Sequence, residues 1–196
     1  MDLYRPEIIP DTTPEDKPPS ARRFIFDMVE TLALAVVLYF VIQTLTARIK
    51  VESTSMVPTL HANDYVVVNK LAYKLGQPSR GDIIVFKYPP DPTQIPYIKR
   101  VIGLPGDQVR ISGGKVYING VLLNEPYLKV STNQGGEWTV PAGSLFVLGD
   151  NRNGSSDSRA WGWVPISDVI GKAEVIYWPP QHWAQLHISS AAAATP

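Results

Sequence analysis

An apolar segment near the start of the chain limits the possible folds more than any other feature. Eleven consecutive apolar residues run from Leu32 to Ile42, and weaker apolar flanks extend the segment to residues 24–47. A helix that crosses the hydrocarbon core of a bilayer needs about 20 residues. Residues 24–47 are therefore predicted to be a transmembrane anchor, with Asp27 and Glu30 close to one interface.

Two other interpretations of this segment stay open. One is a buried helix of a globular core, because eleven uninterrupted apolar residues fall short of the roughly 18 that mark a membrane span. The other is a cleaved signal peptide, although signal peptides begin with a short basic region. Here residues 1–20 are mostly polar and contain five prolines. This composition predicts a flexible tail over residues 1–23.

Basic residues on the two sides of the apolar segment bear on its orientation. Lys17, Arg22 and Arg23 precede the segment, whereas Arg48 and Lys50 follow it. The cytoplasmic flanks of membrane spans carry the excess of lysine and arginine. The surplus of one basic residue before the segment favours a cytoplasmic N-terminus.

After residue 60 the pattern changes to short strands. The runs "DYVVVNK" and "GDIIVFKY" are rich in β-branched and aromatic residues and are bounded by turn residues. In "QVRISGGKVYINGVLLNE" a Gly-Gly pair and an Asn-Gly pair separate three strands, and Asn-Gly favours the type I′ turn of hairpins. Residues 48–186 are therefore predicted to form a mainly β domain of antiparallel, hairpin-linked strands. Residues 187–196 are predicted to be a loose C-terminal tail.

Composition argues against several classes of function. Lysine plus arginine and aspartate plus glutamate each number 18, so the net charge is zero and no nucleic-acid partner is expected. The chain has no cysteine, which excludes a thiol nucleophile and disulfide bonds. His61, His182 and His187 show no paired spacing with nearby acids. We therefore expect no metal, no cofactor and no Ser-His-Asp triad.

The sequence "SGGK", residues 112–115, fits the S-x-x-K pattern of β-lactam-binding enzymes. That pattern requires the serine and the lysine to lie one helical turn apart. A Gly-Gly pair between two strands forms a hairpin instead. We therefore expect no catalytic role for Ser112 and Lys115.

A lysine within an apolar strand is the strongest candidate for chemistry. In "YIKRVIGLPGD", residues 97–107, Tyr97, Lys99 and Val101 would share one face of a strand. Because Lys99 and Arg100 are adjacent, at least one of them must face inward or reach a partner. Apolar surroundings can lower a lysine pKa by up to about 3–5 units, which would make the amine a general base for a serine hydroxyl. The alternative is a lysine whose ammonium group reaches water.

Two polar segments accompany this lysine. "VESTSMVPTL", residues 51–60, follows the apolar segment and reads by itself as a polar linker. "GDNRNGSSDSRAWGWVP", residues 149–165, alternates acids with arginines, which can form bidentate pairs that brace a loop. Trp161 and Trp163 in this segment suit either a membrane interface or a β core.

Taken together and in this order, the anchor, "STSMVPTL", "GDIIVFKYP", "YIKRVIGLPGD" and "GDNRNGSSDSRAWGWVP" resemble type I signal peptidases. These are membrane-bound serine proteases that remove signal peptides from exported proteins. The resemblance covers the anchor and nearly all of residues 48–180. A single apparent span and a spacing of about fifty residues between Lys99 and "GDNR" resemble the compact bacterial type. Thr54 stands where many members have glycine.

The resemblance implies a role for each matching position. Ser55 matches the nucleophile, Lys99 matches the general base, and the Ser53 hydroxyl and the Ser55 N–H match the oxyanion hole. The remaining matches would support the site through a hydroxyl that orients the lysine and through two ion pairs: Ser155, Asp157 with Arg159, and Arg100 with Asp150. The implied fold is the family's set of coiled antiparallel sheets.

The resemblance also implies substrate and location. Secretory preproteins would bind to a sheet edge, with small side chains preferred one and three residues before the cut. The N-terminus would be cytoplasmic and the domain would lie outside a bacterial cell membrane or a thylakoid-type membrane. An alternative from another class is a membrane-tethered peptide-binding module without catalysis. A self-cleaving repressor would use similar chemistry, but the DNA-binding helical domain of such proteins is not found here.

Overall fold

The computed structural model describes residues 21–186 of the chain. Nearly all of the tail predicted over residues 1–23, and all of the tail predicted over residues 187–196, lie outside this range. The chain divides into two compact units, Met1–Val41 and Ile42–Pro196.

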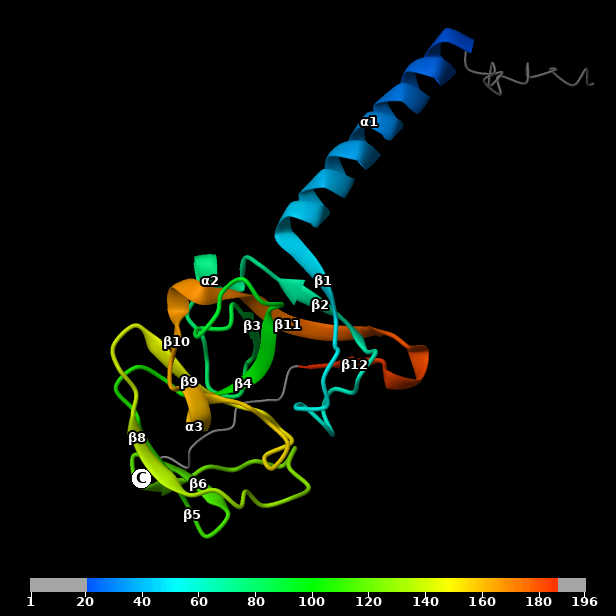
Figure 1. Ribbon diagram of the computed structural model, residues 1–196. Helices are drawn as coiled ribbons and strands as arrows, with labels where there is room; N and C mark the ends of the chain where they lie inside the picture. Colours follow the sequence, from blue (N-terminus) through cyan, green and yellow to red (C-terminus); the bar gives the residue numbers. More distant parts are fainter. Residues whose placement is uncertain (1–20, 187–196) are drawn as a thin grey trace, which may run out of the picture. The chain divides into compact units, whose positions relative to one another are not determined.

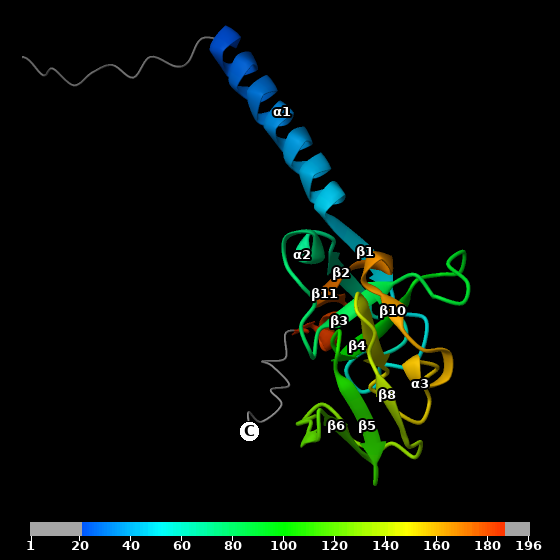
Figure 2. The same cartoon turned by 90° about the vertical axis from the view of Figure 1, so that its left-hand side faces the viewer.

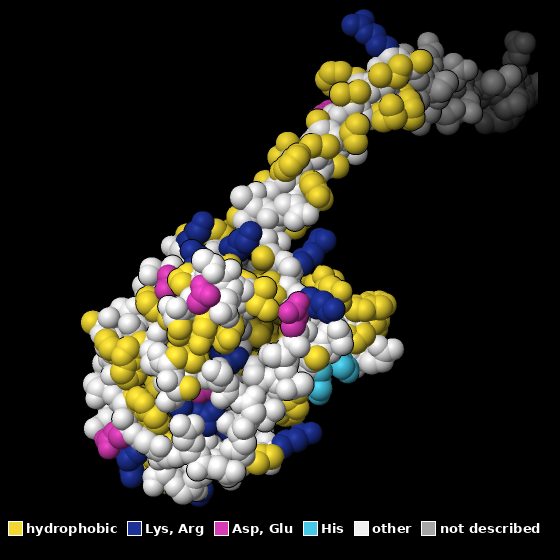
Figure 3. Space-filling model, viewed as in Figure 1, with side chains coloured by type: hydrophobic (Ala, Val, Ile, Leu, Met, Phe, Trp, Pro, Cys, Tyr) yellow, Lys and Arg dark blue, Asp and Glu magenta, His cyan; other side chains and the backbone are white. Residues whose placement is uncertain are grey.

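Helix α1 (Ala21–Leu45) accounts for the apolar segment. Its most apolar 18-residue window has a mean hydropathy of 2.2, and none of its residues is buried. Apolar side chains cover the helix on the side seen in Figure 3. A helix that exposes apolar side chains on all sides is suited to lipid rather than to water. Among the described residues, α1 is the one helix long and apolar enough to cross a membrane.

The second unit is mainly β, as predicted. Its larger sheet has the order β1-β2-β11-β3-β4-β9-β10, with β12 added on β11. All neighbouring strands in it are antiparallel, and the sheet is strongly curled (Figure 1). The strands are β1 (Thr46–Lys50), β2 (Tyr65–Asn69), β3 (Ile83–Phe86), β4 (Tyr97–Gly103), β9 (Ser144–Leu148), β10 (Val164–Pro165), β11 (Val169–Trp178) and β12 (Ala184–Gln185).

A smaller antiparallel sheet has the order β7-β6-β5-β8. Its strands are β5 (Gln108–Ser112), β6 (Lys115–Ile118), β7 (Val121–Leu122) and β8 (Gly136–Thr139). Gly113 and Gly114, and then Asn119 and Gly120, adopt positive φ angles in the two hairpin turns, which confirms both predicted hairpins. Ser112 pairs with Lys115 directly across the first turn. The "SGGK" sequence is therefore a hairpin, as expected.

Short helices connect some of the strands. They are α2 (Ala72–Leu75), α3 (Ser158–Trp161) and the 3₁₀ helices η1 (Ile166–Asp168) and η2 (Pro180–His182). Asp157 precedes α3, and its carboxylate accepts a hydrogen bond from the Arg159 N–H. This is the usual way in which an aspartate caps the beginning of a helix. The acidic side chain is thereby held in a fixed position.

Buried apolar side chains form three clusters in this unit. One contains Met56 and residues of β2 and β11, and another lies between the smaller sheet and part of β4 and β9. The views in Figure 1 and Figure 2 agree that β5, β6 and β8 lie at one end of the unit and β1, β2 and β11 at the other. Trp163 packs against Phe146 in this second cluster. The third cluster contains Phe86, and Trp161 packs against it. Both tryptophans thus take part in core packing.

Candidate active site

Ser55 lies in a loop over residues 51–64 that is closed at its base. The Val51 N–H donates to the Asp64 carbonyl, and the Asn63 N–H donates to the Val51 carbonyl, each over 2.8 Å. Met56 and Leu60 are completely buried in the core, whereas Ser53 is exposed. The apolar residues therefore anchor the loop from inside, and Ser55 remains at its edge with 6% exposure.

A second segment holds the backbone around Ser55. The Asn151 N–H donates to the Ser55 carbonyl over 2.9 Å, and the Asn151 side-chain amide donates to the Thr54 carbonyl over 3.2 Å. A Cβ atom at Gly149 would lie 2.5 Å from the Ser55 carbonyl oxygen, so this close approach requires glycine. Sequence reasoning missed the roles of Gly149 and Asn151, although both lie in a segment that it singled out.

Lys99 lies in β4, a strand between β3 and β9 in the interior of the sheet. Its side chain is 3% exposed, and Nζ donates to Ser55 Oγ over 2.7 Å and to the Ile98 carbonyl over 3.0 Å. The Tyr97 ring lies on the same side, with its centroid 5.2 Å from Nζ. The predicted alternation of side chains along this strand is confirmed.

Lys99 pairs with no carboxylate within residues 21–186. Burial lowers the pKa of Lys99 to about 8, while the more distant negative charges of Asp157 and Asp150 act in the opposite direction. Removal from water disfavours the charged ammonium group, and no salt bridge compensates for it. The neutral fraction of the amine at pH 7 is consequently larger than that of a free lysine, and a general base needs this neutral form.

Two potential oxyanion donors lie at Ser55. The Ser53 and Ser55 hydroxyl oxygens are 3.1 Å apart. The Ser55 N–H donates to no protein acceptor in the described part of the chain. An N–H and a hydroxyl beside a serine oxygen are the kinds of donor that can stabilise a developing oxyanion.

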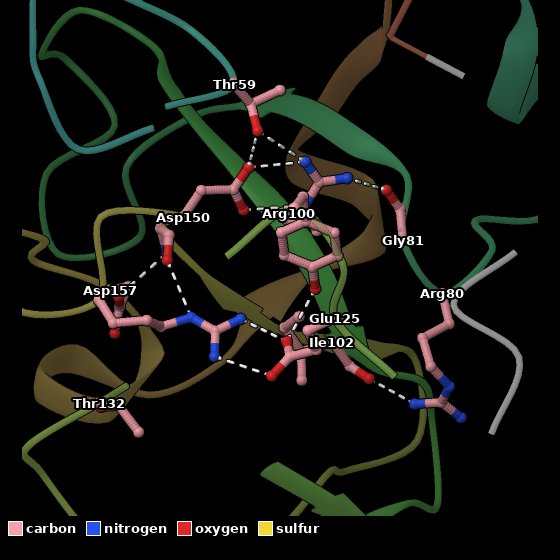
Figure 4. Close-up of polar contacts among 12 residues, drawn as sticks. Thr59, Arg80, Gly81, Arg100, Ile102, Glu125, Thr132, Asp150 and Asp157 are labelled. Carbon is pink, nitrogen blue, oxygen red and sulfur yellow. Dashed lines mark hydrogen bonds and ion pairs between the residues drawn. The ribbon is translucent and has the colours of Figure 1, made fainter. Parts of the chain in front are cut away.

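Arg100 points away from Lys99 into a separate polar network. It is completely buried and binds Asp150 through two hydrogen bonds, Nε to Oδ1 over 2.8 Å and Nη2 to Oδ2 over 2.6 Å. Figure 4 shows its guanidinium between Asp150 and the Gly81 carbonyl, to which it also donates over 2.8 Å. Thr59 donates to Asp150 over 2.5 Å, and the Tyr127 ring centroid lies 3.9 Å from the guanidinium carbon. This expected ion pair is present.

The second expected ion pair is also present. Arg159 binds Asp157 through Nε and Nη2, each over 2.8 Å, and both side chains are almost fully buried. The Asp157 carboxylate also accepts a hydrogen bond from the Gly149 N–H over 3.1 Å. Arg159 also donates to Thr132 over 3.0 Å and to the Arg152 carbonyl over 2.6 Å. The pair thereby stabilises the segment that contacts the Ser55 backbone.

A third buried ion pair joins Arg152 to Glu125, which lies between β7 and β8 in the chain. Glu125 also accepts a hydrogen bond from the Tyr127 hydroxyl over 2.7 Å, and Figure 4 shows it in the same network as Arg100 and Asp150. The sequence contained no signal for this pair, because Glu125 lies 27 positions from Arg152 in an irregular segment.

Ser155 is the one supporting residue without the expected contact. Its hydroxyl oxygen is buried and has no hydrogen-bond partner among the described residues. Lys99 Nζ instead donates to Ser55 and to the Ile98 carbonyl. Ser155 does lie against Gly149, close to the Ser55 carbonyl, so its influence on the lysine remains a prediction.

Ser55 and Lys99 line a groove of about 570 Å³. Residues 48–55 form one part of its lining and residues 95–99 another, together with Gly154 and Ser156. Strand β1 is at the end of the sheet order and, within residues 21–186, pairs with β2 alone, so its other edge is open to an extended peptide there. The structure also brings His61, Asp64 and His182 together, and none of these three residues lines the groove.

Comparisons with known proteins agree on one family. Residues 25–178 match the family described as "Signal peptidase, peptidase S26". A signal peptidase I of Leptolyngbya laminosa is 42% identical over 189 residues, which cover 90% of this chain and 91% of that protein. A probable signal peptidase I-2 of Synechocystis is 40% identical over 179 residues, or 88% and 81% of the two chains. A crystal structure of an Enterococcus faecalis signal peptidase I is 41% identical, with a TM-score of 0.45, and the match covers 50% of this chain and 97% of that one.

Proposed function

The chain belongs to the peptidase S26 family of signal peptidases, and we propose that it removes signal peptides with Ser55 as the nucleophile and Lys99 as the general base. One observation carries this proposal. A buried amine that has no carboxylate partner among the described residues lies 2.7 Å from a serine hydroxyl, within the distance needed for proton transfer.

The lowered pKa makes the amine available at neutral pH. With a pKa of about 8, about one Lys99 side chain in ten is neutral at pH 7, compared with about one in 2,500 for a free lysine. Neutral Lys99 takes the proton of the Ser55 hydroxyl as Oγ attacks the scissile carbonyl. Lys99 then protonates the leaving amine, and water hydrolyses the acyl-enzyme.

The oxyanion of the tetrahedral intermediate needs donors that are already in place. The Ser55 N–H and the Ser53 hydroxyl would supply them, and removal of one such donor typically costs about 2.7–4 kcal/mol of transition-state stabilisation. The Ser53 hydroxyl now lies 3.1 Å from the Ser55 hydroxyl, so a small rotation would direct it to a bound carbonyl oxygen. Ser155, in this proposal, helps to orient Lys99 during turnover.

The substrate is an exported preprotein that binds as an extended strand along the free edge of β1. Backbone hydrogen bonds would supply affinity that does not depend on sequence, and shallow pockets in the groove would select small side chains one and three residues before the cut. A preprotein carrying a small-residue cleavage site fits these requirements.

Helix α1 would hold this chemistry close to the bilayer. Residues 24–47 would form a single span with a cytoplasmic N-terminus, and residues 48–186 would form the extracytoplasmic catalytic domain. Ser55 follows Ala47 by only eight positions, and this short connection would keep the proposed nucleophile near the membrane surface at which signal peptides emerge. The alternative of a binding module requires no chemistry from Ser55.

Cleavage of a labelled preprotein by the full-length protein in detergent tests the proposal. Ser55→Ala should abolish cleavage, whereas the matched control Ser112→Ala should cleave at the wild-type rate because Ser112 lies on an exposed hairpin. Near-UV circular dichroism would show that both variants are folded. Normal cleavage by Ser55→Ala would rule out the serine mechanism.

A further inference from the structure

Two histidines and an aspartate meet at the base of the loop that carries Ser55. His61 and Asp64 belong to the end of the loop, and His182 comes from η2, 118 positions after Asp64. Potential metal-ligand atoms of the three side chains all lie within 4.8 Å of one another. Figure 3 shows histidine side chains gathered at one place on the visible face. Spacing in the sequence did not indicate this cluster, because His182 is distant in the chain and only the tertiary fold brings it to His61 and Asp64.

The aspartate is buried, whereas the histidines are accessible. Asp64 is 0% exposed, and the side chains of His61 and His182 are 48% and 40% exposed. Asp64 Oδ1 lies 2.6 Å from His182 Nδ1, and Asp64 Oδ2 accepts a hydrogen bond from the His61 backbone N–H over 2.7 Å. Within residues 21–186 no lysine or arginine pairs with Asp64. A buried carboxylate without a basic partner favours any cation that can reach it.

The distances are close to those that a transition metal requires. Tetrahedral Zn²⁺ binds nitrogen and oxygen ligands at about 2.0–2.2 Å, so its ligand atoms lie roughly 3.3 Å apart. The separation of 2.6 Å between His182 Nδ1 and Asp64 Oδ1 would have to widen slightly. The separation of 4.0 Å from His61 Nδ1 is measured to the other carboxylate oxygen, Oδ2. Because one ligand atom from each of the three residues lies within 4.8 Å of the others, the His61 nitrogen would have to move closer by up to about 1.5 Å. Rotation of the two exposed imidazoles can provide both changes while the buried aspartate stays in place.

We propose that His61, Asp64 and His182 bind one divalent transition-metal ion, with Zn²⁺ the best match and water completing its coordination. Imidazole nitrogen suits Zn²⁺, whereas Mg²⁺ and Ca²⁺ require oxygen ligands, of which this cluster has too few. The ion joins η2 to the base of the Ser55 loop, next to the backbone hydrogen bonds that close it. Its effect is stabilisation of the loop, and it takes no part in the chemistry at Ser55.

Isothermal titration of the chelator-treated full-length protein with ZnCl₂ near pH 7 tests this site. We expect one Zn²⁺ ion per chain and a higher unfolding temperature in its presence. His61→Ala and His182→Ala should each weaken binding at least about tenfold. Both side chains are partly exposed, so these variants should fold, and circular dichroism would verify this. MgCl₂ should produce neither effect.

His187→Ala provides the matched control, since it removes the remaining histidine of the chain, which lies outside the described residues. This variant should bind Zn²⁺ like the wild type. Acidification to about pH 5 should release the ion, because protonated imidazole cannot be a ligand. The proposal is overturned by the absence of saturable binding, by unchanged binding in the His61→Ala, His182→Ala double variant, or by an equal loss in His187→Ala.

Discussion

The two sides of β4 provide different surroundings for two neighbouring basic residues. Lys99 and Arg100 are consecutive and both are buried, but Arg100 has a bidentate carboxylate, a carbonyl and an aromatic ring as partners. Lys99 has a hydroxyl, a carbonyl and the Tyr97 ring beside it, and no carboxylate partner within residues 21–186. A guanidinium cannot lose its proton in a protein, so burial requires a counter-charge. An ammonium group can lose its proton, so burial without a counter-charge yields a neutral base. The paired Arg100 is part of the folded framework, whereas the unpaired Lys99 is suited to chemistry.

The largest expected effect comes from Lys99→Met. Cleavage of a preprotein should fall at least about 10³-fold, because among the described residues no other base contacts Ser55 Oγ. The free energy of unfolding at pH 7 should rise by about 1–3 kcal/mol, because methionine avoids burying an ammonium group whose pKa drops from 10.5 to about 8. Preprotein assays and chemical unfolding followed by tryptophan fluorescence measure the two changes. If Lys99→Met lowers the free energy of unfolding instead, then burial of the Lys99 ammonium group does not destabilise the wild-type protein.

The same comparison predicts how stability depends on pH. The folded pKa of Lys99 is lower than the unfolded one, so between pH 8 and 10.5 the unfolded chain binds more protons. The free energy of unfolding of the wild-type protein should therefore increase as pH rises through this window. Lys99→Met should lack that contribution, which the difference between the two unfolding curves isolates.

On the other side of β4, Arg100→Met should destabilise the protein by about 3–5 kcal/mol, because it leaves the buried Asp150 carboxylate without its partner. The double variant Arg100→Met, Asp150→Leu should recover much of this loss, since it removes both charges together. Unfolding midpoints of the single and double variants provide the measurement. Equal destabilisation in both would mean that the polar contacts of Thr59 and Gly81, rather than the unpaired charge, determine the cost.

The pH profile of cleavage should follow the protonation of Lys99. The value of kcat/KM should increase about tenfold per pH unit below pH 8 and level off above it, because only the neutral amine accepts the Ser55 proton. Initial rates with a peptide substrate would give this profile, and circular dichroism would verify that the protein remains folded at the acidic end. A rate that stays constant down to pH 5 is incompatible with a lysine base.

The smallest expected effect concerns the charges around Lys99. Arg159→Gln leaves Asp157 uncompensated, which should raise the pKa of Lys99 and reduce the rate at pH 6.5 by about two- to tenfold. Asp157→Asn should move the profile in the opposite direction. Arg80→Gln is the matched control, because Arg80 pairs with Asp107 and neither residue contributes to the Lys99 pKa. Shifts of the same sign in both test variants would indicate a general disturbance of the fold.

Local patterns predicted much of the fold and two of the ion pairs near Ser55. The Gly113-Gly114 and Asn119-Gly120 turns form as expected, because positive φ angles are a property of the residues themselves. The predicted anchor, residues 24–47, largely coincides with α1, but β1 begins at Thr46, where pairing with β2 replaces the helix. Both predicted Asp-Arg pairs are present, and the order of the motifs indicated the family that the comparisons established.

Contacts between distant segments were not predictable in the same way. No periodicity connects Glu125 with Arg152, Asn151 with the Ser55 carbonyl, or His182 with Asp64. Each contact depends on how the sheets curl and on which loops they bring together. These are consequences of packing the whole core, to which every strand contributes.

Residue chemistry and short-range pattern were sufficient to predict an apolar helix, a hairpin-rich β domain and a candidate serine and lysine, because each follows from a side chain and its near neighbours. Whether Lys99 meets Ser55 within 2.7 Å, and whether its neighbourhood excludes both water and carboxylates, was decided by the folded sheet. Burial and Coulomb interactions depend on distances in space. The same lysine on an exposed strand would remain charged and inert as a base.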